Sequence, residues 1–489
     1  MGRRTIARTR SRSGVSRCVT VVGGGLAGSE AAWQLASRGF EVVLHEMRPL
    51  TTTPAHKTDK LAELVCSNTF KSTELTNAHG LLKAEMRLLG SMILEAADGA
   101  RVPAGSALAV DRHVFSAAVT ERIASESRIN VVRKEVTEIS APCVIATGPL
   151  TSDKLAEAIR ARLGIDALAF YDAIAPIIAR DSIDDSIVFR GSRYGKETMD
   201  GADDEGAYLN CPMTRGQYDE FVDALISADQ YRGHEFDEVP YFEGCMPVEV
   251  MAKRGRDTMR FGPLKPVGLR DPRTGREAYA VVQLRQEDRA GRMWNLVGFQ
   301  TRLRIPEQQR VLRMIPGLAE AEFLRYGSIH RNSYLNSPAS LSAHLAAREE
   351  PTILFAGQIT GVEGYTESSA TGLLAGINLA RLLSGEKPAV PPATTMLGAL
   401  YRYMNEADPK HFQPMNANFG LLDELSEKVK DKKQKREMFA ARALRSMSDW
   451  IEANDICERE TVEVMSMRGE AVEDLSNKFP EPVSVSAPT

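Results

Sequence analysis

The chain has 489 residues, of which 43% are hydrophobic and 26% charged, a composition typical of a globular protein of about two to three domains. Its formal net charge of −4 excludes a general affinity for nucleic acid, so any basic surface must be local. The six widely spaced cysteines form no CxxC pair and no Cys/His cluster, which argues against a zinc site and favours free thiols in the cytoplasm. No apolar run approaches the roughly 18 residues that cross a membrane.

Both ends of the chain predict disordered segments. Residues 1–17 are rich in Arg and Ser, contain no acidic residue and lack the apolar segment of a signal peptide. A solvated tail is the simpler interpretation of this basic arm, and contact with RNA is the alternative. Residues 471–489 predict a second disordered tail.

Residues 18–49 predict an apolar strand, a Gly-rich turn, an amphipathic helix and a second apolar strand that ends at Glu46. The turn fits G-x-G-x-x-G, in which the glycines permit a tight turn, close approach to a pyrophosphate and close helix–strand packing. The start of the helix offers N–H groups to the phosphates, and Glu46 would accept hydrogen bonds from the ribose hydroxyls. The predicted cofactor-binding residues here are Gly23, Gly24, Gly25, Leu26, Ala27, Gly28 and Glu46.

A second strand–turn–helix unit lies near the other end of the chain. Residues 352–383 place three glycines before a helix rich in small residues, whose start would face the electron-rich edge of a flavin. An apolar strand over 143–146, with Cys143 in the core, runs into Ala-Thr-Gly-Pro and resembles the return strand of two-dinucleotide-fold flavoproteins. The cofactor residues predicted for the second unit are Gly357, Gly361 and Gly364.

The two units predict an α/β protein with a Rossmann-like FAD-binding domain of the two-dinucleotide-fold type. An α+β insertion domain interrupts this domain, and a helical C-terminal region follows it. The predicted ranges are 18–183 and 326–384 for the two parts of the FAD-binding domain, 184–325 for the insertion and 385–470 for the helical region.

The middle of the chain is polarised in charge. Residues 184–250 hold 16 Asp and Glu against 5 Lys and Arg, whereas residues 251–313 hold 15 Lys and Arg against 6 acidic residues, a net +9. Tyr279, Trp294 and Phe299 lie among these arginines, as in a surface that contacts RNA. The alternative is an ordinary solvated face.

Two thiols lie outside plausible core strands. Cys66, in "LAELVCSNTFKSTEL", interrupts an amphipathic pattern, as a functional turn would. Cys245, in "FEGCMP", is followed by Lys253, Arg254 and Arg256, and positive surroundings favour a reactive thiolate. The alternative for each cysteine is an inert, buried apolar side chain.

Beyond these patterns, residues 18–450 resemble the bacterial flavin- and folate-dependent tRNA (uracil-5-)-methyltransferases, relatives of larger flavoproteins that modify the wobble uridine. Residues 301–311, "TRLRIPEQQRV", depart from the family pattern, and both ends of the chain are unmatched. The stretches that carry the resemblance include "GGGLAGSEAAWQLA", "ELVCSNTFKS", "YLNCPMTRGQY", "FEGCMPVEVMA", "RFGPLKPVGL", "RNSYLNSP" and "FAGQITGVEGYTESSATGLLAG".

The resemblance implies FAD that is reduced by NAD(P)H, methylenetetrahydrofolate as the carbon donor, and no metal or membrane. The product would be 5-methyluridine in the T-loop of tRNA. The two family cysteines correspond to Cys66 and Cys245. A thiolate that adds at uracil C6 activates C5, and the base must leave its stack to be reached. We expect Cys245 to attack C6, because of its basic context, and Cys66 to lie near the flavin.

Three alternatives remain. The first is a flavoprotein that modifies wobble uridine, although such proteins are longer and have an extended helical C-terminal domain. The second is a flavin oxidoreductase for a small amine or thiol, which has no use for a basic stretch. The third is a non-catalytic tRNA-binding protein that retains the flavin for structure.

Overall fold

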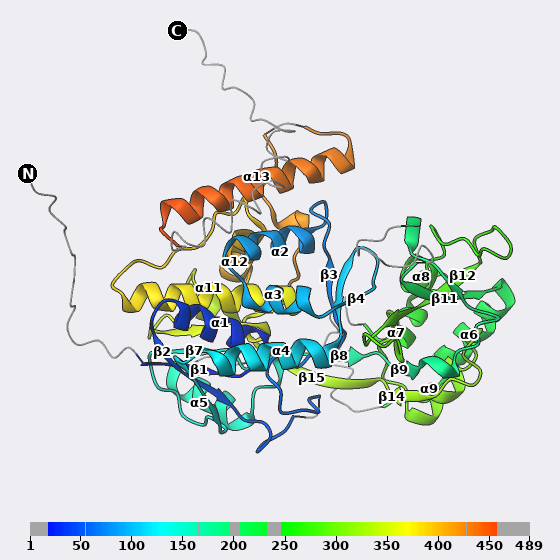
Figure 1. Cartoon of the computed structure of the whole chain (residues 1–489), viewed down its shortest axis with the longest axis horizontal. Coiled ribbons are helices and arrows are strands. Elements are labelled where there is room, and N and C mark those ends of the chain that lie inside the picture. The colour runs from blue at the N-terminus through cyan, green and yellow to red at the C-terminus, as the bar shows by residue number, and fades with distance from the viewer. Residues whose placement is uncertain are drawn as a thin grey trace, which may run out of the picture.

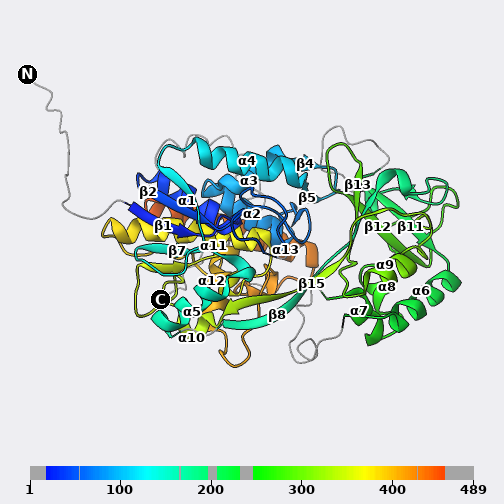
Figure 2. The ribbon, with the colours of Figure 1, turned by 90° about the horizontal axis from the view of Figure 1, so that it is seen from below.

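The computed structural model describes residues 18–53, 55–164, 167–195, 206–231, 246–426 and 428–456. The described chain forms a larger and a smaller domain, connected by a two-stranded antiparallel ribbon (Figures 1 and 2). The ribbon consists of β8 (Ala167–Ile174) and β15 (Ser328–Leu335). Each domain has its own hydrophobic core.

A five-stranded parallel sheet forms the centre of the larger domain, in the order β16-β7-β1-β2-β6. Parallel strands covered on both faces are apolar throughout, as the runs "VTVV" and "CVIA" are. The first four strands in chain order come from residues 18–145, and the fifth returns from beyond residue 350. The strands are β1 (Cys18–Val22), β2 (Glu41–Glu46), β6 (Ile129–Arg133), β7 (Cys143–Ile145) and β16 (Ile353–Phe355).

Helices α1 (Leu26–Ser37) and α11 (Tyr365–Leu383), which follow the two Gly-rich turns, pack tightly on one another. A Cβ atom on Gly372 would lie 2.2 Å from the carbonyl oxygen of Ala27, and one on Gly376 would lie 2.7 Å from that of Ala31. The small residues of α11 therefore have a packing role, because they let the two helix backbones meet.

The rest of the larger domain covers this centre. A small antiparallel sheet and four helices come from residues 69–163, and the C-terminal helices share the same core. Glu85 joins them, since its carboxylate accepts hydrogen bonds from the N–H groups of Met396 and Leu397. The elements are β3 (Thr69–Ser72), β4 (Arg101–Val102), β5 (Ala107–Val110), α2 (Ala78–Leu88), α3 (Met92–Gly99), α4 (Arg112–Ser125), α5 (Asp153–Leu163), α10 (Ser337–Ser340), α12 (Met396–Glu406) and α13 (Lys432–Ala453).

The described residues of the inserted domain form a six-stranded antiparallel sheet, in the order β10-β11-β12-β13-β9-β14, and four helices. Strand β9 pairs within this sheet, so the sheet includes residues before the predicted boundary at 184. The elements are β9 (Ile177–Ala179), β10 (Phe189–Arg190), β11 (Tyr208–Met213), β12 (Ala280–Gln286), β13 (Met293–Leu296), β14 (Phe323–Arg325), α6 (Arg215–Ser227), α7 (Val248–Arg254), α8 (Thr258–Phe261) and α9 (Ile305–Leu312).

Candidate functional site

A cavity of about 1050 Å³ of empty space opens at the carboxyl edge of the parallel sheet. Its walls come from the turns that follow β1, β2, β6, β7 and β16, so it lies where ligands bind in open parallel sheets. Of the predicted cofactor residues, those that line the cavity are Gly23, Gly24, Gly25, Leu26, Ala27, Glu46 and Gly357.

Three of the four glycines of the first turn, Gly23, Gly25 and Gly28, have different surroundings. Gly23 has φ +102°, and a Cβ atom there would lie 2.5 Å from the carbonyl oxygen of Ala146. Gly28 is not part of the cavity lining, and a Cβ atom on it would lie 1.8 Å from the carbonyl oxygen of Gly23. Gly25 has nothing within 4 Å of its Cβ position, so its missing side chain leaves open space in the cavity. Gly23 and Gly28 thus serve the fold, whereas Gly25 leaves open space at the cavity wall.

Glu46 ends β2, as predicted, but its carboxylate already has partners. Its oxygen atoms accept hydrogen bonds from the N–H of Gly24 at 3.0 Å, the N–H of Arg48 at 2.9 Å and the Arg48 guanidinium at 3.0 and 3.2 Å. Burial favours a raised pKa of the carboxyl, but the hydrogen bonds and charge of Arg48 outweigh it and hold the pKa below its usual range. A ribose would therefore meet a saturated carboxylate and would have to displace one donor.

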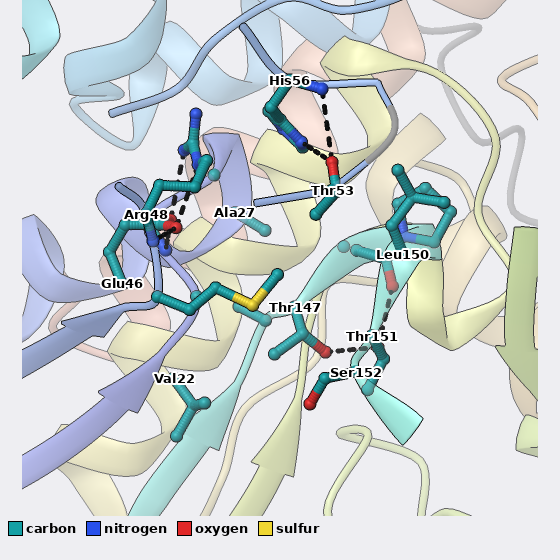
Figure 3. Close-up of a pocket in the computed structure, with 18 of the residues that line it drawn as sticks. Val22, Ala27, Glu46, Arg48, Thr53, His56, Thr147, Leu150, Thr151 and Ser152 are labelled. Atoms are coloured by element: carbon teal, nitrogen blue, oxygen red, sulfur yellow. Dashed lines mark hydrogen bonds and ion pairs between the residues drawn. The ribbon is translucent and has the colours of Figure 1, made fainter. Parts of the chain in front are cut away.

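The loop after β2 folds over the same end of the sheet and is fastened by this arginine. Arg48 also donates to Glu63 at 3.0 Å and to the carbonyl of Thr58 at 3.2 Å. Figure 3 shows Arg48 folded onto Glu46, with Thr53 bonded to His56 on the cavity wall. The opposite wall carries Thr147, the Thr of the Ala-Thr-Gly at the end of the return strand, and the residues Leu150, Thr151 and Ser152 that follow it.

Of the three predicted glycines in the second Gly-rich unit, one lines the cavity and the other two pack against residues outside it. Gly357 has φ +80° and lines the cavity. Gly361 and Gly364 do not line it, because their Cβ positions face the ring of Phe412 and the carboxylate of Glu367. The glycines of this turn therefore allow close packing around the start of α11, which places Tyr365 and Ser368 in the cavity wall.

Glu367, in the first turn of α11, is a buried carboxylate. One of its oxygen atoms lies 3.0 Å from Nδ1 of His79 and accepts a hydrogen bond from the N–H of Ala417 at 2.9 Å. Burial would raise the pKa of this carboxyl, but His79, Lys71 and Ala417 lower it to about 2. Glu367 therefore connects α2 and the segment at 417 to the helix that carries Tyr365.

Cys66 lies in the irregular loop before β3, next to the cavity. Val65 lines the cavity, and the N–H groups of Cys66 and Ser67 donate to the hydroxyl of Tyr365 at 2.9 and 3.1 Å. Because Tyr365 is itself a cavity residue, the backbone of Cys66 is one hydrogen bond away from the cavity wall. That Cys66 lies near a flavin stays a prediction, and the geometry places its backbone beside the cavity wall.

Two arginines hold the carbonyl groups of the same loop. Arg112, the first residue of α4, donates to the carbonyls of Leu64 at 2.9 Å and Cys66 at 3.4 Å. Arg325, at the end of β14, donates to the carbonyls of Val65 and Cys66, both at 3.3 Å. Burial, followed by the charge of Arg112, lowers the pKa of Arg325 to about 10.

The other cysteines differ from Cys66. Cys143 and Cys211 are fully buried in β7 and β11, and burial raises the pKa of Cys143 to about 12 and that of Cys211 further still. These thiols are parts of the core, as predicted for Cys143. Cys245 lies outside the described residues, one position before the buried Met246 in the sequence.

Only some residues of the basic stretch 251–313 lie on the surface, where the predicted contact with RNA requires them. Trp294 and Phe299 are 1% and 0% exposed, so the expectation that these aromatic side chains contact RNA is wrong, because they build the core of the inserted domain. Arg256 pairs with Asp219 at 3.0 Å and Asp223 at 2.7 Å, so carboxylates from the acidic half of the domain neutralise it. The exposed cations of this stretch include Lys253 and Lys265.

Sequence reasoning did not identify several residues of the site. Arg48 follows Glu46 by two positions, and its charge next to a predicted cofactor-binding carboxylate was the available signal. Tyr365 directly follows Gly364, in a position where an aromatic residue can reach a cofactor. The contacts of Arg112 and Arg325 with the loop of Cys66 were not predictable, because no residue next to either arginine in the sequence indicates a contact with residue 66.

The parallel sheet, the Gly-rich turns and the interrupted larger domain define an FAD-binding fold of the two-dinucleotide type. The profile of the family "Glucose inhibited division protein A" matches residues 18–387. Two crystal forms of GidA from Aquifex aeolicus have the same fold, with TM-scores of 0.65 and 0.66 at 15% identity. The two comparisons cover 96% and 94% of this chain and 79% and 80% of GidA.

Relatives with higher sequence identity show which family within this class of flavoproteins the chain belongs to. The chain is 58% identical over 435 residues to methylenetetrahydrofolate–tRNA-(uracil-5-)-methyltransferase TrmFO of Geobacter sulfurreducens, covering 88% of this chain and 98% of that protein. It is 55% identical over 434 residues to TrmFO of Bacillus licheniformis, with 88% and 98% covered. The chain belongs to the TrmFO family. Among the described residues, no helix has the length and apolarity that a membrane crossing requires.

Proposed function

We propose that this protein methylates C5 of the T-loop uridine of tRNA, with methylenetetrahydrofolate as the carbon donor and FAD reduced by NAD(P)H. The observation that carries the proposal is 58% identity across almost the whole of a TrmFO relative. The cavity at the sheet edge and the position of the Cys66 loop beside it support the same reaction. A cytoplasmic location is part of the proposal, because folate and tRNA meet there.

The residues of the cavity fit FAD. Gly25 is the N-cap residue of helix α1 and provides no side-chain cap, so the first N–H groups and the positive dipole end of the helix are available to a pyrophosphate. Gly25 leaves the space that such a group needs. FAD would supply the redox and one-carbon transfer chemistry, and the protein would supply orientation and exclusion of water.

The two cysteines have separate roles in the proposal. Cys245 would add as a thiolate to uracil C6, which moves an electron pair to C5 and makes that carbon nucleophilic. After C5 gains its carbon substituent, loss of the C5 proton and expulsion of the thiolate would restore the aromatic base. Cys66 would assist on the cofactor side, which the hydrogen bonds of its loop to the cavity residue Tyr365 support.

The inserted domain would bind the T-arm through its exposed cations. Lys253 and Lys265 are exposed in the basic stretch that follows Cys245. Such contacts would place phosphates beside the thiol that acts on the base, so that a flipped uridine reaches both cysteines.

Nucleoside analysis of tRNA tests the proposal directly. Unmodified tRNA is incubated with the purified protein, NADPH or NADH and methylenetetrahydrofolate. The tRNA is then digested, and its nucleosides are separated by chromatography and identified by mass spectrometry. We expect 5-methyluridine at one position in the T-loop, and none when the folate is omitted. A different modified nucleoside, in the anticodon, would support the wobble-uridine alternative, and an unmodified tRNA would contradict the proposal.

A further inference from the structure

The end of strand β12, in the inserted domain, contacts the loop that carries Cys66. Gln286 accepts a hydrogen bond at its carbonyl from the side chain of Asn68 at 2.9 Å, and Arg285 donates to the same side chain at 2.8 Å. Glu287, the next residue, pairs with Arg112 through both carboxylate oxygens, at 2.7 and 3.3 Å. Three consecutive residues of the inserted domain thus fasten the segment around Cys66.

The Glu287–Arg112 pair is well shielded from water. The Glu287 side chain is 1% exposed and the Arg112 side chain 13% exposed. A two-point pair between a guanidinium and a carboxylate fixes the plane of the guanidinium, and water competes weakly at a buried site. Held in this plane, Arg112 donates to the carbonyls of residues 64, 65 and 66.

The loop of Cys66 has no regular secondary structure to satisfy its backbone groups. Its carbonyls depend on Arg112 and Arg325, and its N–H groups on Tyr365. Glu287 pairs with Arg112, and its negative charge also raises the pKa of the neighbouring Arg325, against the effect of burial. Without Glu287, Arg112 would lose its orientation and the loop would lose three donors.

We propose that Glu287 is a positioning residue: through Arg112 it lets the inserted domain hold the Cys66 loop against the cofactor cavity. This inference rests on the proposed function for its catalytic consequence. It assigns no contact between Glu287 and any substrate. It predicts that the distance between the thiol and the reacting groups depends on a residue of the other domain.

The test uses the full-length protein with bound flavin and the substitution Glu287→Gln, which keeps the shape of the side chain. We expect flavin content and the rate of flavin reduction by NADPH to stay within about twofold of the wild type. Formation of 5-methyluridine should fall by about 100-fold in kcat, with KM for tRNA little changed, because a small displacement of a reacting group has an effect of that size. Alkylation of Cys66 by iodoacetamide, followed by mass spectrometry, should become about tenfold faster as the loop opens.

Two further variants separate positioning from general stability. Arg112→Gln should reproduce both effects, and the double variant should be no worse than either single variant, because the two residues act as a unit. Glu307→Gln, which removes a carboxylate from an exposed arginine pair in the same domain, should leave alkylation and kcat unchanged. Glu287→Asp, which keeps the charge, should restore part of the kcat.

Wild-type alkylation kinetics and kcat in Glu287→Gln would overturn the inference, as would losses that multiply in the double variant. A lower melting temperature with unchanged alkylation and kcat would also overturn it, since the pair would then serve stability alone. If the wild type makes no 5-methyluridine, the proposed function fails, and the alkylation rates still decide whether Glu287 holds the loop.

Discussion

Gly25 offers a test in which the effect on the cofactor can be separated from the effect on the fold. Its φ of −76° and ψ of −167° suit any residue, and nothing lies within 4 Å of its Cβ position. Gly25→Ala should therefore change the stability of the flavin-free protein by less than about 1 kcal/mol, because the gain from a less flexible unfolded chain is offset by the poorer N-cap that Ala makes. Gly28→Ala is the contrasting variant, because its Cβ atom would lie 1.8 Å from a carbonyl oxygen. We expect it to cost about 3 kcal/mol or more.

The effect of a larger side chain at Gly25 follows from what the turn offers a pyrophosphate. In Gly25→Val the two added methyl groups would occupy the space beside the first N–H groups of α1. Losing two charge-assisted hydrogen bonds at about 1.5 kcal/mol each weakens binding by about 3 kcal/mol, or roughly 100-fold in Kd. The flavin-free variant should still fold.

Cofactor binding is measured by the flavin absorbance of the purified proteins and by titration of the flavin-free forms with FAD. The stability of the fold is measured by thermal unfolding followed by circular dichroism. We expect Gly25→Val to be pale and folded, and Gly28→Ala to be poorly folded whether or not FAD is added. Full flavin content and a wild-type Kd in Gly25→Val would refute the placement of the pyrophosphate at this turn.

Three further predictions follow from the site. The pKa of the Glu367 carboxyl is about 2 in the folded protein, compared with an ordinary value of 4.5 that we take for the unfolded chain. The ionised carboxylate therefore adds about 3 kcal/mol to the free energy of unfolding above pH 4.5, and this contribution is lost as the pH falls towards 2. Urea unfolding at about pH 5 and pH 3 should show that Glu367→Gln is less sensitive to acid than the wild type. Replacing Lys253 and Lys265 with Gln should lower the log–log salt slope of tRNA binding by about 0.7–0.9 for each lost phosphate contact, and an unchanged slope would place the RNA elsewhere. Cys245→Ala should retain FAD but form no covalent adduct with a 5-fluorouridine T-loop RNA, whereas an adduct that persists there and vanishes in Cys66→Ala would reverse the two roles.

Much of the larger domain was predictable because its signals are local in the sequence. The apolar strand before Gly23, the glycine spacing and Glu46 at the end of the second strand lie within one short segment, and the structure confirms each element. The second unit, over 352–383, was predictable for the same reason, and its strand pairs beside β7 as a split dinucleotide domain requires. The long charged helix near the C-terminus is α13.

The chemical surroundings of these residues were decided by tertiary structure. The sequence alone left Glu46 open to a ribose, but Arg48 folds back and occupies its carboxylate. Composition placed Trp294 among RNA-contacting residues, but the inserted sheet buries it.

The loop of Cys66 shows most clearly what could not be predicted from the sequence. A break in the amphipathic pattern was enough to predict a functional turn there. The groups that hold the turn come from Arg112, Glu287, Arg325 and Tyr365, on four elements that meet only when both domains have folded. Local patterns specify which strands and turns form, because neighbouring residues share one backbone. The partners of a buried polar group are set by packing between distant segments, and this is why the sequence indicated Cys66 but not the residues that position it.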